Sequence, residues 1–407
     1  MTTWDLAVVG AGPAGAAAAI GALGVDPSLR VALLDRATFP RDKACGDGIA
    51  PQVLDLLAEV GVGSVVAGLH GVTRLSLRRG DLEVERPMAR SAWVVPRAEF
   101  DHRLVTAAQA AGADVLHERV REVHDGSLVR LDDRHQSRVV VGADGAHSVV
   151  RRPAGLAAGP QAVALRGYAP TPPDRAGAQA IVFDTARQPA YAWSFDRGDG
   201  LSNVGYGVLV GRRGGGLTKA QMLERLDALL PGASAGGTDW KGHRLPLSAG
   251  PWRPSRGRVL LVGDAAGLVN PMTGEGIYYA VATELAAGRA AAAAIKDGVP
   301  ESAGQRYAAA VRPLLDRHLR HVRLAAWLCR SGPLVDAGLR ASAAEQPVFD
   351  DLVELGLARG RITPALARGL ARELTRDLAN ELTGATARRT TTTPNQTRHE
   401  ERASCES

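Results

Sequence analysis

Three glycines with a fixed spacing stand near the start of the chain. Residues 10–15 read Gly-Ala-Gly-Pro-Ala-Gly, which is the pattern G-x-G-x-x-G. In such a turn Gly10 permits a tight bend, Gly12 lets a pyrophosphate approach the backbone, and Gly15 brings a helix close to a strand. The chemistry predicted here is the binding of a dinucleotide.

The segments around this turn are those that a dinucleotide site needs. The apolar run Asp5–Val9 precedes it as a buried strand would, and Ala14–Leu23 follows it as a helix of small residues. The N-terminus of that helix would face the phosphates. A second apolar run, Val31–Leu34, stops at Asp35, twenty residues after Gly15, where a carboxylate can bind an adenosine ribose.

Two later segments narrow the nucleotide to FAD. Residues 142–151 read Gly-Ala-Asp-Gly-Ala-His-Ser-Val-Val-Arg and match the pattern D-G-x-x-S-x-V-R of FAD-dependent monooxygenases and their relatives. Residues 263–267 read Gly-Asp-Ala-Ala-Gly and resemble the G-D-A-A segment of the same superfamily, whose Asp binds the flavin-side ribose. Arg97 resembles the arginine that this superfamily holds near the flavin.

The branch of the superfamily is indicated by three further motifs. Residues 36–49, Arg-Ala-Thr-Phe-Pro-Arg-Asp-Lys-Ala-Cys-Gly-Asp-Gly-Ile, resemble the F-P-R-x-K-x-C-G-x-G segment of the geranylgeranyl reductase family. Residues 263–277 are similar to its G-D-A-A-G-x-x-N-P-x-x-G-E-G-I, and residues 191–195, Tyr-Ala-Trp-Ser-Phe, to its Y-x-W-x-F-P. The resemblance covers about residues 5–300. Asp196 departs from it, because the family usually has proline there, and this puts the shape of the substrate wall in doubt.

Other branches fit less well. Aromatic hydroxylases usually place histidine after G-D-A-A and continue with P-P, where this chain has Gly267 and Asn270-Pro271. Flavin halogenases carry a tryptophan-rich segment and a catalytic lysine that are not visible here.

The resemblance implies an FAD-binding set drawn from these motifs, with Val120 in addition. Its members are Gly10, Gly12, Pro13, Ala14, Gly15, Asp35, Arg36, Cys45, Gly46, Asp47, Gly48, Arg97, Val120, Asp144, Gly145, Gly263, Asp264, Pro271, Gly274, Gly276 and Ile277. The backbone N–H groups of the helix that opens at Ile277 would stabilise negative charge on a reduced flavin. Glu275 beside them either serves the site or only caps that helix.

The catalytic candidates are Cys45, Tyr191 and Trp193. In the resemblance Cys45 lies in a loop near the flavin, where a thiol can donate a proton, although a small packing residue would also suit a tight loop. Tyr191 and Trp193 alternate on an expected strand, so their side chains share one face. That face is either a wall of an apolar substrate cavity or ordinary sheet core.

The elements predict an α/β protein in which a Rossmann-type domain is interrupted by a second domain. The FAD-binding domain takes residues 1–74, 97–155 and 251–300, and a mixed or antiparallel β-sheet substrate domain takes 75–96 and 156–250. A helical region follows over 301–384, and residues 385–407, rich in Thr, Arg and Glu, are expected to form a disordered tail.

Composition excludes several classes of protein. The net charge of +6 comes from scattered arginines, with no basic run interleaved with aromatics, so we expect no nucleic-acid partner. Three cysteines, Cys45, Cys329 and Cys405, have no C-x-x-C spacing and predict neither a disulfide framework nor a metal site. No apolar run has the ~20 residues of a membrane span. We therefore expect a cytoplasmic protein, whose C-terminal helices either pack on the core or touch a membrane surface.

The resemblance implies a reductase that saturates carbon–carbon double bonds of an apolar, isoprenoid or polyene, substrate. Because the single G-x-G-x-x-G is assigned to FAD, electrons would come from transiently bound NAD(P)H or from a reduced protein such as a ferredoxin. The alternatives are an NAD(P)H-dependent FAD monooxygenase acting on a natural product and a flavin-binding protein without turnover.

Overall fold

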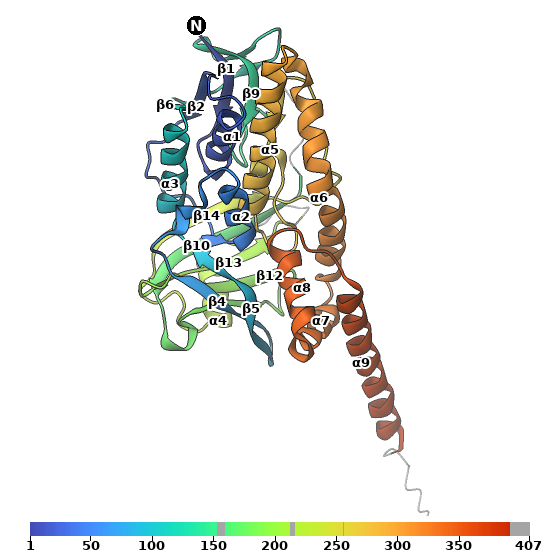
Figure 1. Ribbon diagram of the computed structural model, residues 1–407. Coiled ribbons are helices and arrows are strands. Elements are labelled where there is room, and N and C mark those ends of the chain that lie inside the picture. The colour runs from blue at the N-terminus through green and yellow to red at the C-terminus, as the bar shows by residue number, and fades with distance from the viewer. Residues whose placement is uncertain (153–158, 212–215, 255, 391–407) are drawn as a thin grey trace, which may run out of the picture.

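The computed structural model describes residues 1–152, 159–211, 216–254 and 256–390, with side chains in the last helix described as far as Asn380. Two sheets lie end to end, and long helices run beside both of them (Figure 1). The predicted class, an α/β protein with a second sheet and a helical C-terminal region, is confirmed. Among the described residues no helix is both long enough and apolar enough to span a membrane.

The first sheet has seven strands in the order β6-β2-β1-β9-β8-β7, with β15 pairing to β9. Their bounds are β1 (Thr2–Val9), β2 (Val31–Asp35), β6 (Asp114–His117), β7 (Val123–His124), β8 (Val129–Leu131), β9 (His135–Gly142) and β15 (Val259–Leu261).

The register of this sheet explains why distant motifs meet. β1, β2, β9 and β15 run parallel, so their carboxyl ends lie at one edge. Val9 pairs with Leu34 and Gly142, and Gly142 pairs with Leu261. The segments that follow these ends therefore start side by side, at the edge where open α/β sheets bind ligands.

Three helices cover the sheet, α1 (Pro13–Leu23), α3 (Arg97–Ala110) and α5 (Ile277–Lys296). Small residues allow α1 and α5 to approach closely. A Cβ on Gly288 of α5 would lie 2.0 Å from the carbonyl oxygen of Ala18, so this crossing needs glycine. The alanine-rich character of both helices thus has a packing cause.

The second sheet has eight strands in the order β14-β10-β13-β12-β11-β4-β5-β3. Their bounds are β3 (Gly48–Ile49), β4 (Gly71–Arg79), β5 (Leu82–Val94), β10 (Gln161–Pro170), β11 (Ala178–Phe183), β12 (Ala190–Asp196), β13 (Leu201–Leu209) and β14 (Thr238–Pro246). The helix α4 (Lys219–Leu229) packs Met222 and Leu226 into a cluster on this sheet.

One boundary of this sheet differs from the expectation. β3 and the first residues of β4 pair within this sheet, although they precede the expected boundary at residue 75. The expected boundary at 155/156 falls outside the described residues.

The short helix α2 (Pro51–Ala58) lies between β3 and β4 along the chain. After α5, the described residues form four more α-helices. They are α6 (Ala303–Leu328), α7 (Gly332–Ala344), α8 (Gln346–Leu357) and α9 (Pro364–Thr390). α6 runs along α5, while Leu339 of α7 and Phe349 of α8 join a core cluster with Val84 and Met88 of β5. α9 continues to Thr390, so residues 385–390 are helical and the expectation of a disordered tail from 385 was wrong for them. The remainder of that tail, with Cys405, lies outside the described residues.

Candidate functional site

A cavity of about 970 Å³ runs between the two sheets and reaches the C-terminal helices. Most of the predicted site residues line it. They are Gly10, Gly12, Pro13, Ala14, Asp35, Arg36, Cys45, Gly46, Gly48, Arg97, Val120, Asp144, Gly145, Tyr191, Trp193, Asp264, Gly274, Gly276 and Ile277. Gly15, Asp47, Gly263 and Pro271 do not line it.

The glycines of the first turn have two different tasks. Gly10 has φ +100°, and a Cβ on Gly15 would lie 1.8 Å from the carbonyl oxygen of Gly10, so both are required by the fold itself. A Cβ on Gly12 would meet nothing nearer than the Arg41 guanidinium at 3.4 Å. Gly12 therefore leaves open space in front of the N-terminus of α1, which has no side-chain cap. This bare, uncapped turn suits the pyrophosphate of FAD.

Positive charge is concentrated opposite that turn. Arg97 holds the buried Asp101 through two hydrogen bonds of 2.6 and 2.8 Å, and Arg41 pairs with the same carboxylate at 2.8 Å. Burial disfavours the Arg97 cation, but the Asp101 carboxylate more than offsets this and raises the pKa of Arg97. Two guanidinium groups share one carboxylate, so a net positive charge faces Gly12 and would attract an anionic ligand.

Acidic side chains stand at the other strand ends. Asp35 accepts hydrogen bonds from the backbone N–H of Ala11 at 2.8 Å and of Ala37 at 2.9 Å, which fixes its carboxylate beside the glycine turn. Burial raises the pKa of Asp144, which accepts from the N–H of Val149 at 2.6 Å while its Oδ1 has no partner. An acceptor of this kind can serve a ligand hydroxyl.

Arg151 joins the Asp144 and Asp264 loops. Its guanidinium donates to the backbone carbonyls of Ala265 at 2.8 Å, Asp264 at 2.9 Å and Ala146 at 3.2 Å. Lys43 reaches the Asp264 carboxylate at 3.4 Å from the other side of the cavity. Arg151 lies inside the D-G-x-x-S-x-V-R motif, yet the predicted set omits it.

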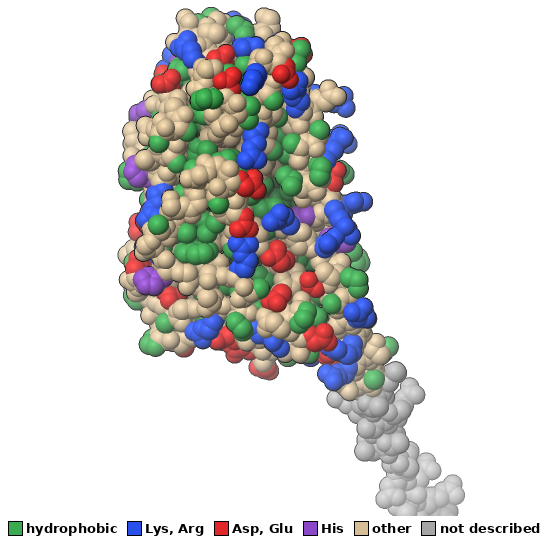
Figure 2. Space-filling view, in the orientation of Figure 1, with side chains coloured by type: hydrophobic (Ala, Val, Ile, Leu, Met, Phe, Trp, Pro, Cys, Tyr) green, Lys and Arg blue, Asp and Glu red, His purple; other side chains and the backbone are tan. Residues whose placement is uncertain are grey.

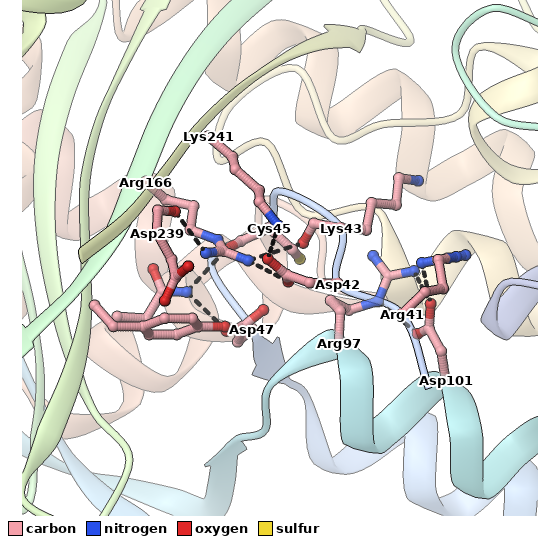
Figure 3. A network of polar contacts seen from close by, with 12 residues as sticks. Arg41, Asp42, Lys43, Cys45, Asp47, Arg97, Asp101, Arg166, Asp239 and Lys241 are labelled. Atoms are coloured by element: carbon pink, nitrogen blue, oxygen red, sulfur yellow. Dashed lines mark hydrogen bonds and ion pairs between the residues drawn. The ribbon is translucent and has the colours of Figure 1, made fainter. Parts of the chain in front are cut away.

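The loop that carries Cys45 rests on a buried polar network, shown in Figure 3. Asp47, fully buried with φ +60°, accepts from the hydroxyl of Tyr168 at 2.6 Å and from the amide of Asn203 at 2.8 Å. Burial raises the pKa of Asp47 to about 6. Asp47, which was predicted to bind the cofactor, does not line the cavity, and the contacts of its carboxylate with Tyr168 and Asn203 support the loop.

Asp42 anchors the same loop from its other end (Figure 3). The buried guanidinium of Arg166 donates to Asp42 and, at 3.3 Å, to the carbonyl of Lys43, and it lies 4.5 Å from the ring centre of Tyr168. Lys241 pairs with Asp42 at 2.5 Å. Because β10 and β14 supply these cations, the second sheet fixes the Cys45 loop against the cavity.

Cys45 lines the cavity and is partly buried. Burial raises the pKa of this thiol, an effect that the nearby Arg97 cation opposes. The thiol is therefore protonated at neutral pH. A protonated thiol in an apolar cavity can donate a proton, whereas a thiolate nucleophile is disfavoured.

The wall opposite Cys45 is the aromatic face of β12. Rings of Tyr191, Trp193 and Phe195 follow one another with centroid separations of 5.9 and 6.4 Å. The indole N–H of Trp193 donates to Asn203 at 2.9 Å, and Tyr191 donates to the carbonyl of Thr273. Asp196, the departure from the family pattern, is buried and accepts from Gly177 and Gly198, so it shapes a turn and does not line the cavity.

The turn before α5 closes the site. Glu275 accepts from the N–H of Tyr278 at 3.0 Å, so it caps the helix, and burial raises its pKa to about 7. Asn270 accepts from Met272 at 2.9 Å and donates to the carbonyls of Leu355 and Gly356 at the end of α8. The C-terminal helices are thereby tied to the site, and Leu328, Leu334, Leu352, Leu366 and Leu370 make the far end of the cavity apolar.

Comparisons with known proteins indicate the family of the chain. Residues 3–187 match the FAD binding domain family. A menaquinone reductase from Mycobacterium tuberculosis is 34% identical over 304 residues, covering 69% of this chain and 74% of that protein. A digeranylgeranylglycerophospholipid reductase from Methanopyrus kandleri is 33% identical over 323 residues, covering 72% and 82%.

Solved structures share the fold. A geranylgeranyl bacteriochlorophyll reductase-like protein from Thermoplasma acidophilum superposes with a TM-score of 0.74 at 21% identity, over 93% of this chain and 99% of that one. An anhydrotetracycline hydroxylase from Streptomyces rimosus gives 0.62 at 21% identity, over 87% and 76%. At such identities the likeness concerns the fold alone, and the fold serves both reductases and hydroxylases.

Proposed function

Because the chain belongs to the geranylgeranyl reductase family of FAD-dependent oxidoreductases, we propose that it saturates carbon–carbon double bonds of an apolar, isoprenoid or polyene, substrate. The observation that carries this proposal is the shape and lining of the cavity. One continuous space joins the nucleotide edge of the first sheet, the Cys45 loop and a leucine-rich end formed by the C-terminal helices. A long apolar molecule fits such a space.

The residues at the nucleotide edge fit FAD. Gly12 and the uncapped start of α1 would receive its pyrophosphate, with Arg97 and Arg41 balancing the charge. Asp35 and Asp264 would accept hydroxyl groups of its ribose and ribityl portions. When bound and reduced, FAD would supply the hydride, while the protein would position the alkene and supply the proton.

The protein positions the alkene and supplies the proton. Trp193 and Tyr191, each fixed by a hydrogen bond, would hold the substrate opposite the Cys45 loop. The Cys45 thiol, protonated at neutral pH, would give its proton to one alkene carbon while the other receives hydride. The product then has two more hydrogens than the substrate, and a proton from solvent restores the thiol. The apolar lining excludes competing water.

The electrons would arrive from NAD(P)H bound transiently or from a reduced ferredoxin-like protein. The support for this is the presence of a single G-x-G-x-x-G motif, which the FAD of the family occupies.

The decisive experiment is anaerobic turnover of the purified flavoprotein with prenyl substrates and each donor in turn, followed by mass analysis of the products. Alkene reduction adds two hydrogens per double bond. Addition of one oxygen atom, with oxygen uptake and NAD(P)H consumption in air, would replace this proposal by a monooxygenase. A flavin that no donor reduces would indicate a binding protein without turnover.

A further inference from the structure

The outward face of α6 carries an unusual pair of features, exposed apolar side chains among arginines. Trp327 is 63% exposed and Leu324 is 48% exposed, which is uncommon for side chains of this size. Arg317 and Arg320 are exposed on the same side. Spacings of three, four and three residues lead from Arg317 through Arg320 and Leu324 to Trp327, so all four share one helical face. We call these four residues the outer face of α6.

The charge of this face is strongly one-sided. Within α6 the only acidic residue is Asp316, against five arginines. In the part of the chain that the structure describes, neither Arg317 nor Arg320 forms an ion pair with an acidic side chain. Burial lowers the pKa of His321, and the nearby positive charges of Arg317, Arg320 and Arg361 lower it further. Figure 2 shows Lys and Arg side chains following the edge of the molecule that α6 forms.

The inner side of the same helical turns lines the cavity. Ala325, Leu328 and Cys329 belong to its wall, whereas Trp327 is exposed to solvent. Ala367 on α9 also lines the cavity and is exposed, so the apolar end of the cavity reaches the surface at α9. The segment that precedes α9 contacts α6, where the N–H of Ile362 donates to His321 at 3.3 Å.

We propose that the outer face of α6 docks on an anionic lipid bilayer. Tryptophan and leucine enter the interfacial region of a bilayer, while arginines on the same face bind anionic headgroups. An acidic electron-donor protein would also match the charge, but it must reach the flavin, and this face lies beside the opposite, leucine-rich end of the cavity. Docking on the bilayer does not depend on the proposed function. Only the entry of an apolar substrate from the docked face rests on that function.

The test is co-sedimentation of the holoprotein with vesicles of phosphatidylcholine containing phosphatidylglycerol, compared with pure phosphatidylcholine, over a series of salt concentrations. We expect binding to the anionic vesicles that weakens with salt. The variant Arg317→Gln/Arg320→Gln should bind about fivefold more weakly per arginine removed. Trp327→Ala should weaken binding by about tenfold or more.

A control variant replaces an exposed arginine and an exposed leucine at another part of the surface. Arg130→Gln on β8 together with Leu201→Ala at the start of β13 removes an exposed arginine and a leucine that is 37% exposed, away from α6. It should bind vesicles like the parent protein. All variants change exposed residues, and unchanged melting temperature and flavin absorbance establish that they fold.

Three results would overturn the proposal. One is the absence of binding to anionic vesicles, and another is equal binding by the α6 variants and the control. The third is a combination of two results, in which the α6 variants bind vesicles as well as the parent protein but no longer accept electrons from an acidic ferredoxin. That combination would mean that the face binds a protein donor. Because sedimentation needs no turnover, a failure of the proposed alkene reduction would leave this measurement unaffected.

Discussion

The amide of Asn203 joins Trp193 to the loop that carries Cys45. Its oxygen accepts the indole N–H of Trp193 at 2.9 Å, and its nitrogen donates to the carbonyl of Cys45 and to Asp47, both at 2.8 Å. Asn203 is completely buried on β13. One side chain thus sets the position of the aromatic wall and of the thiol opposite it.

We expect Asn203→Ala to lower both stability and turnover. The substitution leaves the buried indole N–H without an acceptor and removes one donor from Asp47, which should cost about 1–3 kcal/mol in the free energy of unfolding per group left unpaired. A double-mutant cycle with Trp193→Phe separates positioning from general damage. Phenylalanine has no N–H, so the Asn203 substitution should reduce kcat less in that background. Effects on kcat that simply multiply would contradict the positioning role.

Cys45→Ala should lower the rate at which the reduced flavoprotein reduces the alkene by about 10²-fold or more, the usual contribution of a general acid. FAD content should not change, because the substitution removes only the thiol and keeps the loop. Cys329→Ala is the matched control, since it removes a buried thiol from the far end of the same cavity. Equal rates for the two variants would assign Cys45 to packing and the proton to water.

The pKa of Asp47 has a consequence for stability. Its carboxyl titrates near 3.9 in an unfolded chain and at about 6 when folded, so the folded protein binds the proton more tightly. Stability from this group is present below pH ~4 and is lost as the pH rises toward 6, by at most about 3 kcal/mol. Asparagine tolerates the positive φ at this position and can still accept from Tyr168.

Asp47→Asn should therefore flatten the dependence of unfolding free energy on pH between about 4 and 6 relative to the parent protein. Urea titrations at several pH values in that interval measure the difference. Taking the difference between the two proteins removes the effects of other carboxyls, such as Asp42 and Asp184, whose pKa values are lowered. Parallel curves for the two proteins would show that Asp47 is ionised throughout.

The sequence allowed prediction of those parts of the site that a local pattern encodes. The turn at Gly10–Gly15 and the loops at Asp144 and Asp264 follow parallel strands, and the geometry of a strand end, a glycine and a helix start is contained in a few neighbouring residues. The register then brings these loops together without further information, because parallel strand ends share an edge.

The supports of the site were not predictable in this way. Asn203 is 158 residues from Cys45 and Arg151 is 113 residues from Asp264, so each acts through a contact that only the tertiary fold creates. Asp47 shows the converse case. It lies inside a matching motif, yet its positive φ and its bonds to Tyr168 and Asn203 direct its carboxylate behind the loop. A motif predicts which segment lies at the site, but the packing of that segment determines which of its side chains face the cavity.

The glycines of the first turn offer a test that separates folding from cofactor binding. Gly15→Ala should destabilise the protein even without FAD, because its Cβ would lie 1.8 Å from the carbonyl oxygen of Gly10 and the backbone would have to shift. Gly12→Ala creates no such clash, since the nearest atom is a flexible arginine terminus at 3.4 Å. Its methyl group would instead occupy the space in front of α1, so the apoprotein should melt as before while FAD binds at least about tenfold more weakly.

Gly250→Ala serves as the control, because a Cβ there meets nothing within 4 Å. Melting temperatures of the apoproteins and FAD titrations followed by flavin fluorescence give both quantities for all three variants. If Gly12→Ala binds FAD more weakly while its apoprotein melts at the same temperature as the parent, the pyrophosphate lies at this open turn. Equal FAD affinity of Gly12→Ala and the parent protein would mean that the phosphates do not approach this backbone, and the role proposed for Arg97 and Arg41 would fall with it.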